Sequence, residues 1–358
     1  MSPNKSSKGL NASDQRIPVT ILTGFLGAGK TTLLKAILSK KGSERIAVII
    51  NEFGDIGLDH ELIEFVEDEV VLMASGCLCC SLRGDLSRTI TNLIEEKTKG
   101  KLSFERIVIE TTGLADPGPI LQTLLVDSNL AKNVRMDGVI TVVDAANGPT
   151  TLDSNFEAVS QIAMADLILL SKTDIVSKNT VRSFKIRLNS LSPTAEVLQT
   201  VSGNISPETL WNLSGLRKGV DPSNAIAWTT QKFEPHPDPF SNLSGLLKTE
   251  NTSIGEALHD KRISSASIIV EDPIKDAVFD RWLDTLIKLK GPDILRIKGI
   301  VFLDGLETPF VFHGVQHIFD PPVRIDNWIG SDRRSRIVVI ARNLENSELQ
   351  RSFDMLLV

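Results

Sequence analysis

Short apolar runs rich in β-branched residues alternate with helical patterns between Pro18 and Ser202. The runs predict seven strands, which we place at residues 19–23, 46–51, 70–73, 107–109, 138–143, 167–171 and 197–201. Between them, helical spacing predicts helices at residues 31–39, 86–97, 120–125, 158–163 and 180–188. Since the strands are continuously apolar, both faces of the sheet should be buried. The prediction is an α/β fold with a doubly wound, mostly parallel sheet that binds ligands at the carboxyl ends of its strands.

A different order of elements follows a change in composition near Gly203. Residues 235–253 are rich in Pro, Ser, Asn and Gly, which is typical of a linker or long loop. From Ile263 the sequence predicts a strand, a helix at 275–290, strands at 295–303, 310–313 and 337–341, and a helix at 347–357. This order suits a smaller C-terminal α+β domain of antiparallel strands with helices on one face.

These patterns divide the chain into four segments. We predict a disordered tail at residues 1–16, the α/β domain at 17–215, a linker or long loop at 216–262 and the α+β domain at 263–358. A chain of 358 residues has room for about two domains with separate cores.

Charge and hydrophobicity exclude several classes of function. The net charge of −6 argues against the dense Lys/Arg face of a nucleic-acid-binding protein, so we expect no nucleic-acid partner. No run reaches the ~18 continuous apolar residues of a membrane span, and the polar residues 1–16 lack the apolar core of a signal peptide. We therefore expect a cytoplasmic protein that does not contact membranes.

A glycine-rich segment joins the first predicted strand to the first predicted helix. It begins at Gly24, ends in Lys30-Thr31 and matches G-x-x-x-x-G-K-[ST], a loop whose backbone N–H groups wrap phosphate oxygens. Lys30 should reach the β- and γ-phosphates, and the Thr31 hydroxyl should ligate Mg²⁺. The residues predicted to contact nucleotide here are Gly24, Gly27, Ala28, Gly29, Lys30, Thr31 and Thr32. An accidental glycine-rich turn is the alternative, and the flanking strand and helix disfavour it.

A second strand ends at Glu110-Thr111-Thr112-Gly113. A carboxylate at the tip of a buried strand is costly unless it faces a cation or ordered water. We therefore place Glu110 beside the Mg²⁺ shell and the Gly113 N–H toward the γ-phosphate, and we predict that both act in catalysis with Lys30 and Thr31. The alternative is a strand-end Glu110 that points into solvent.

The choice of base is predicted from Ser171-Lys172-Thr173-Asp174, which follows a third strand. One carboxylate, Asp174, could accept both the N1–H and the exocyclic amino group of guanine, whereas adenine offers neither donor there. The Lys172 stem would cover the base plane, and Ser202, beyond the next strand, could offer its backbone N–H to the guanine oxygen. The alternative is an ordinary helix-capping loop.

All three cysteines of the chain lie within four residues, at Cys77, Cys79 and Cys80. Such spacing cannot form a disulfide framework, and three thiolates this close can converge on one Zn²⁺. Thiolate softness favours zinc over cobalt. The alternatives are that these residues are small buried hydrophobes or that the adjacent pair is a redox couple.

A glycine-broken acidic loop at residues 51–59 follows the second predicted strand. Asp55 is the predicted fourth metal ligand, with Glu52 and His60 as further candidates. The loop occupies the chain position of a switch region. If it contacts both the nucleotide and the thiolates, nucleotide state would bias metal affinity, a coupling of typically ~1–3 kcal/mol.

Taken together, these motifs resemble the CobW branch of metal-handling P-loop GTPases of the SIMIBI class, which includes the eukaryotic zinc-transferring GTPases. The matching segments are 24–31, 51–59, 77–80, 110–113 and 171–174, with 296–299, 314–317 and 336–341 in the second half. The resemblance implies a GTP-hydrolysing metallochaperone that transfers zinc, or cobalt, to a client protein. Asp55 departs from the family, which commonly has Glu there.

The residues leave two other functions open. The chain could be a P-loop small-molecule kinase or ATPase, which would need neither Asp174 nor the thiols. It could also be a passive zinc buffer or sensor that ignores nucleotide. A homo-oligomer is a further partner that the sequence leaves open. For the GTPase, the sequence shows no evident arginine finger or water-orienting Gln, so we predict slow intrinsic turnover, on the order of one per minute or less.

Overall fold

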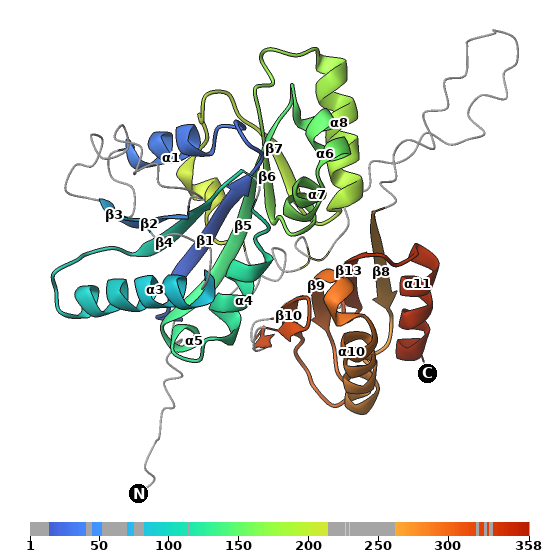
Figure 1. Cartoon of the computed structure of the whole chain (residues 1–358). Coiled ribbons are helices and arrows are strands. Elements are labelled where there is room, and N and C mark those ends of the chain that lie inside the picture. Colours follow the sequence, from blue (N-terminus) through green and yellow to red (C-terminus); the bar gives the residue numbers. More distant parts are fainter. Residues whose placement is uncertain are drawn as a thin grey trace, which may run out of the picture.

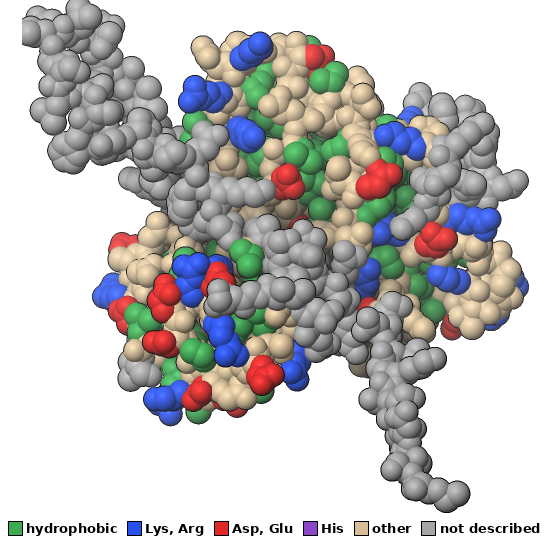
Figure 2. Space-filling model, turned by 180° about the vertical axis from the view of Figure 1, so that it is seen from behind, with side chains coloured by type: hydrophobic (Ala, Val, Ile, Leu, Met, Phe, Trp, Pro, Cys, Tyr) green, Lys and Arg blue, Asp and Glu red, His purple; other side chains and the backbone are tan. Residues whose placement is uncertain are grey.

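The structure is a computed structural model of the chain. It describes residues 14–40, 45–51, 70–74, 82–113, 115–213, 226, 229, 262–319, 322–325, 328 and 332–357. Within these residues, no helix combines the length and the apolar character that crossing a membrane requires. On the face shown in Figure 2, basic and acidic side chains are interspersed, without a continuous basic stripe among the coloured residues.

The first half of the chain forms one parallel sheet (Figure 1). Its strands are β1 (Ile17–Gly24), β2 (Ile46–Asn51), β3 (Val70–Ala74), β4 (Arg106–Thr111), β5 (Val134–Asp144), β6 (Leu167–Ser171) and β7 (Glu196–Gln199). Their order is β3-β2-β4-β1-β5-β6-β7, and every described neighbour pairs in parallel. The predicted α/β fold is confirmed, because each crossover between parallel strands needs a connection over one face of the sheet.

Helices cover both faces of this sheet. They are α1 (Lys30–Leu38), α3 (Leu82–Thr98), α4 (Gly118–Val126), α5 (Leu130–Asn133), α6 (Gly148–Ser154), α7 (Phe156–Ala163) and α8 (Lys178–Leu191). One buried cluster contains Leu33 of α1 and Phe184 of α8, and a second contains Ile90 of α3 and Leu121 of α4. Apolar packing on both faces explains why the strands lack alternation.

The second half forms a separate antiparallel sheet. Its strands are β8 (Ile263–Val270), β9 (Ile294–Val301), β10 (Phe310–Val315), β11 (Ile318–Phe319), β12 (Val323–Arg324) and β13 (Ser335–Arg342). Their order is β11-β10-β9-β13-β8, with β12 against β10. Helices α10 (Asp276–Lys290) and α11 (Asn346–Phe353) contribute Trp282 and Phe353 to one core with this sheet. The predicted α+β arrangement is therefore confirmed.

The antiparallel sheet packs against the parallel domain. Val338 and Ile340 of β13 join the same buried cluster as Met164, at the end of α7. In this interface the Asp166 carboxylate is ion-paired to Arg296 at 2.6 Å and to Lys298 at 2.8 Å. Burial raises the pKa of Asp166, but the two cations outweigh it and hold this pKa well below its usual value. The two halves thus share a sealed interface that contains charges.

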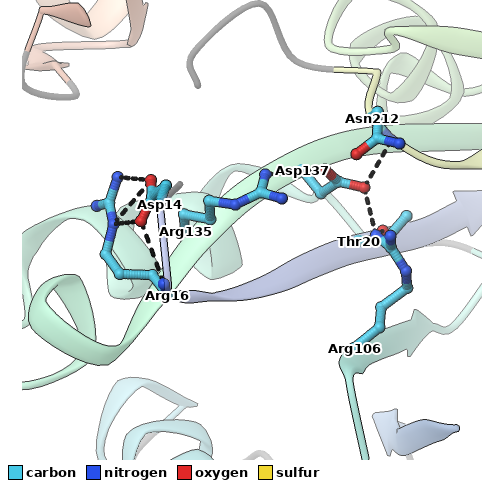
Figure 3. A network of polar contacts seen from close by, with 7 residues as sticks. All are labelled: Asp14, Arg16, Thr20, Arg106, Arg135, Asp137 and Asn212. Atoms are coloured by element: carbon cyan, nitrogen blue, oxygen red, sulfur yellow. Dashed lines mark hydrogen bonds and ion pairs between the residues drawn. The ribbon is translucent and has the colours of Figure 1, made fainter. Parts of the chain in front are cut away.

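A second buried charge network ties the chain beyond β7 back to the sheet (Figure 3). Asp137 of β5 pairs with Arg106, the first residue of β4, and with Arg135 at 3.0 Å. Asp137 also accepts the backbone N–H of Asn212 at 2.9 Å, and the Arg106 guanidinium lies 4.3 Å from the Trp211 ring centroid. This network fixes the segment through which the chain leaves the parallel domain.

Differences from the predicted elements are confined to short segments and ends. The strand predicted at 197–201 ends at Gln199, since Ser202 turns into the left-handed region with φ 50°. The helix predicted at 347–357 ends at Phe353 and continues as a 3₁₀ turn, Asp354–Leu357. The short elements α5, α6, β11 and β12 were not predicted, because two to seven residues are too few for a detectable period.

Candidate functional site

Strand register aligns the carboxyl ends of the central strands. Glu110 of β4 is level with Leu22 of β1 and with Ile50 of β2, and Ile50 is level with Ala74 of β3. The segments that follow these strands therefore start from one edge of the sheet, where ligands bind in open parallel sheets.

The glycine-rich loop leaves β1 in close contact with β5. Gly24 has φ +139°, and a Cβ there would lie 2.1 Å from the Val142 carbonyl oxygen, so only glycine fits. Helix α1 then begins at Lys30. The buried Lys30 ammonium donates to the carbonyls of Gly24 and Phe25, both at 3.1 Å, and so lies across the base of the loop. A loop with a held cation and a helix N-terminus has the donors that a phosphate requires.

Thr31 and Glu110 meet although they lie 79 residues apart in the sequence. The Thr31 hydroxyl donates to the Glu110 carboxylate at 3.1 Å, and Glu110 is only 6% exposed. The alternative of a solvent-pointing Glu110 is therefore wrong. Hydroxyl and carboxylate oxygens are ligands that Mg²⁺ accepts, so this pair fits the predicted cation.

Gly113 packs directly on the glycine-rich loop. A Cβ at Gly113 would lie 2.4 Å from the Leu26 Cα, closer than any side chain could approach. The end of the E-x-x-G segment and the phosphate loop are thus in van der Waals contact through backbone atoms. A group bound by one of them would be near the other.

The segment after β6 contacts the same loop from the opposite side. The Ser171 hydroxyl donates to the Ala28 carbonyl at 2.7 Å. Lys172 has φ 54° and its ammonium pairs with Asp144, while Asp174 is exposed. Beyond β7, a Cβ at Gly203 would lie 3.1 Å from the Leu33 Cα, so the segment carrying the exposed Ser202 rests on α1. The structure therefore gathers the predicted phosphate and base segments at one edge.

Asp144, the last residue of β5, is the residue that the sequence analysis missed. Its carboxylate is buried and accepts the backbone N–H groups of Ala146 at 2.6 Å and Asn147 at 3.0 Å. Burial raises the pKa of Asp144, but Lys172 and these N–H donors outweigh it and keep this pKa below its usual value. The missed signal is the one used for Glu110, a carboxylate that ends a continuously apolar strand.

The predicted zinc ligands lie outside the described residues. These are Cys77, Cys79, Cys80 and Asp55, together with the further candidates Glu52 and His60. Within the described part of the chain, no group of three His, Cys, Asp or Glu side chains could hold a metal ion. What the structure does place is Ala74, three positions before Cys77, at the end of β3 beside β2.

Comparison with known proteins gives two family matches. Residues 18–199 match the CobW/HypB/UreG nucleotide-binding domain, and residues 263–357 match the cobalamin synthesis protein cobW C-terminal domain. The zinc chaperone YjiA of Escherichia coli is 33% identical, over 94% of this chain and 98% of its own. The zinc-regulated GTPase metalloprotein activator 1 of Schizosaccharomyces pombe is 32% identical, over 92% of this chain and 83% of its own. The Zn(II)-bound YjiA GTPase crystal structure superposes with a TM-score of 0.70 and 29% identity, covering 96% of this chain and 99% of YjiA.

Proposed function

The chain belongs to the CobW/HypB/UreG family of nucleotide-binding proteins, and from this premise we propose that it is a GTPase that acts as a zinc chaperone. It hydrolyses GTP to GDP and phosphate, binds zinc at the three cysteines and delivers the ion to a client protein. The relatives named as zinc chaperones and as GTPase metalloprotein activators support this proposal. The observation that carries it is the meeting of the glycine-rich, E-x-x-G and S-K-x-D segments at one sheet edge.

The roles in hydrolysis follow from the contacts at this edge. Lys30 exchanges its two loop carbonyls for the β- and γ-phosphate oxygens, and α1 presents its N-terminal donors to the same group. Thr31 and Glu110 would hold Mg²⁺, directly or through water, and the Gly113 N–H would face the γ-phosphate. Mg²⁺, when bound, neutralises charge that develops on the phosphates.

Guanine selection belongs to the segments after β6 and β7. We assign Asp174 to the N1–H and amino group of guanine, the Lys172 stem to the face of the base, and the Ser202 N–H to the guanine oxygen. Asp174 is exposed and so is accessible to a base, while the Ser171 bond to Ala28 holds the segment against the phosphate loop. A carboxylate that pairs two donors strongly rejects a base lacking them.

Zinc is the cargo of the proposed reaction, and cobalt is the second candidate. We assign Cys77, Cys79 and Cys80 as thiolate ligands and Asp55 as the fourth ligand. Strand order supports a link to nucleotide, because β2 lies between β3 and β4 and its end is level with Glu110. The loop that follows β2 therefore starts between the strand that precedes the cysteines and the strand that carries Glu110.

We extend the proposal to the layout of the chain. The GTPase domain spans 17–215 and the C-terminal domain spans 263–358. Most of the predicted tail at 1–16 and of the predicted linker at 216–262 lies outside the described residues. The protein works in the cytoplasm on a client metalloprotein, without nucleic-acid or membrane partners.

The test is the zinc affinity of the full chain in two nucleotide states. We expect zinc to bind ~5–150-fold more tightly with a non-hydrolysable GTP analogue than with GDP, and this difference to vanish when the three cysteines are replaced by serine. Equal affinities would instead identify a passive zinc buffer. Equal binding of ATP and GTP, with no zinc binding, would identify a kinase or ATPase.

A further inference from the structure

Asp144 is a buried carboxylate at the carboxyl edge of the parallel sheet, where we propose that nucleotide binds. The proposed function assigns Asp144 no role. It ends β5 and is level with Ser171, the last residue of β6. Its carboxylate carries four contacts, divided between its two oxygens. Oδ1 accepts the backbone N–H groups of Ala146 and Asn147, while Oδ2 accepts the Asn147 side-chain amide at 3.3 Å and the Lys172 ammonium.

This division makes Asp144 a rigid anchor. Its side chain is 3% exposed, and the two backbone bonds to Oδ1 close a turn that leads into α6. The orientation of Oδ2 is therefore fixed by the protein before any ligand arrives. An acceptor oriented in this way can hold a flexible partner in one place.

Lys172 is a flexible partner that is held at both ends. Its backbone is in the left-handed region, φ 54°, which is strained for a non-glycine residue and persists where the surroundings enforce it. Ser171, immediately before it, is bonded to the phosphate loop at Ala28. Its ammonium is paired with Asp144, although the side chain is 38% exposed. An exposed lysine side chain otherwise has many rotamers, and restricting it to one of them costs conformational entropy.

We propose that Asp144 is a positioning residue for nucleotide binding. By holding the Lys172 ammonium, it stretches the methylene stem of Lys172 across the place where the guanine base binds, so that the loss of side-chain freedom is complete before binding. The proposal rests on the assigned role of Lys172 toward the base. Asp144 itself does not touch the base or the phosphates.

This arrangement predicts which property of the enzyme depends on Asp144. A pre-ordered Lys172 stem strengthens binding of any guanine nucleotide, GTP and GDP alike. It contributes nothing to charge stabilisation at the γ-phosphate, so kcat at saturating GTP should not change. It also leaves the donor pairing at Asp174 intact, so the preference for guanine over adenine should persist.

The test uses Asp144→Asn, Lys172→Met and the double variant. Asparagine keeps an Oδ1 for the two backbone N–H groups and replaces Oδ2 by an amide that cannot accept from Lys172. We expect Asp144→Asn to weaken GDP binding and to raise KM for GTP by ~10-fold, with kcat within about two-fold of wild type. Lys172→Met should weaken binding at least as much, and the double variant no more than Lys172→Met alone.

The matched control is Asn147→Ala. It removes the side-chain amide contact to Oδ2 and leaves the Lys172 pair in place. We expect unchanged GDP affinity from this control and a thermal midpoint close to that of Asp144→Asn. If Asn147→Ala weakened GDP binding as much as Asp144→Asn does, Asp144 would act through the turn alone, and the proposal would be wrong.

The double variant shows whether Asp144 and Lys172 act together or independently. If the losses from Asp144→Asn and Lys172→Met multiplied in the double variant, the two residues would act independently and the proposal would be overturned. Unchanged GDP binding in Asp144→Asn would overturn it too. Failure of the proposed function looks different, because wild-type protein would then bind ATP and GTP equally well.

Discussion

Two regions of the molecule use the same kinds of residue for different purposes. At the carboxyl edge of the parallel sheet, the Asp144 carboxylate pairs with Lys172, whose side chain is 38% exposed. At the interface between the two sheets, Asp166, Arg296 and Lys298 have side chains that are each 2% exposed. A carboxylate–cation pair thus forms in both places, and only the first keeps a cationic side chain that a ligand can reach.

The difference shows how solvent access separates binding groups from structural ones. In the half-exposed pair, water reaches the Lys172 side chain while the buried Asp144 carboxylate holds its ammonium. A sealed pair cannot open without leaving charges in an apolar environment. The carboxyl edge of the parallel sheet therefore keeps a held side chain accessible to a ligand, and the interface cluster is adapted for fixed orientation of the two domains.

The largest effect is expected at the exposed edge, from Asp174→Asn. This change removes the proposed acceptor for the guanine donors, so the preference for GTP over ATP should fall by on the order of 10⁴-fold. The amide can donate to the 2-oxygen of xanthine, so xanthosine triphosphate binding should rise. Competition titrations with the three nucleotides measure both changes. An unaltered preference for GTP would remove Asp174 from the base site.

A large effect on stability is expected from Asp166→Ala, in the buried interface cluster of Asp166, Arg296 and Lys298, which we call the sealed cluster. Removing this carboxylate takes the ion partner from Arg296 and Lys298 and should lower the free energy of unfolding by ~3–5 kcal/mol. Urea denaturation measures the loss. Asp166→Asn should recover part of it, since an amide oxygen can still accept the Val139 N–H. A change below ~1 kcal/mol would show that the cluster can take up water and is not sealed.

A smaller loss of stability is expected from Gly113→Ala, at the contact between the E-x-x-G segment and the phosphate loop. The new methyl group would lie 2.4 Å from the Leu26 Cα, so the phosphate loop must move. We expect a destabilisation of ~1–3 kcal/mol together with weaker GDP binding. Gly118→Ala is the control, because the nearest atoms to its Cβ would belong to the Asp116 side chain, at 3.1 Å, and the Met164 side chain, at 3.5 Å. Equal GDP affinities for both variants would separate Gly113 from the nucleotide site.

An exposed ion pair on α10 should contribute little to stability. Lys288 and Asp284 lie one turn apart on α10, with an N–O distance of 3.3 Å and side chains 75% and 68% exposed. Lys288→Ala should change the free energy of unfolding by no more than ~0.5 kcal/mol. A loss as large as that of Asp166→Ala would mean that exposure does not govern the strength of these pairs.

The pH dependence of the sealed cluster gives the smallest effect near neutrality. Because the folded-state pKa of Asp166 is lowered, its contribution to stability is fully present above the unfolded pKa of ~3.9 and is lost as pH falls through the folded pKa. The stability difference between wild type and Asp166→Asn should thus be constant from pH 8 to pH 5. Urea midpoints across this range measure it. A steady decline between pH 8 and 5 would contradict the lowered pKa.

Strands, helices and motif segments that a short sequence pattern identifies could be predicted from the sequence. Strand β6 was predicted with its observed ends, because continuous apolar runs identify strands buried on both faces. The E-x-x-G pattern predicted Glu110 beside the Mg²⁺ shell, and the structure brings its carboxylate to Thr31, the predicted Mg²⁺ ligand. The roles of these residues toward nucleotide and Mg²⁺ stay predictions, as do those of Asp55 and the three cysteines.

By itself, then, the sequence determined the order of elements, the two classes of sheet and the edge at which the motifs gather. Only the tertiary structure decided which charges meet. Asp144 and Lys172 are 28 residues apart, and Asp166 and Arg296 are 130 apart. No local sequence pattern predicts either ion pair, because these pairs depend on which strands become neighbours and on how one sheet packs on the other. Burial, which makes Asp166 structural and leaves Lys172 accessible, is likewise a property of the packed molecule and not of any segment.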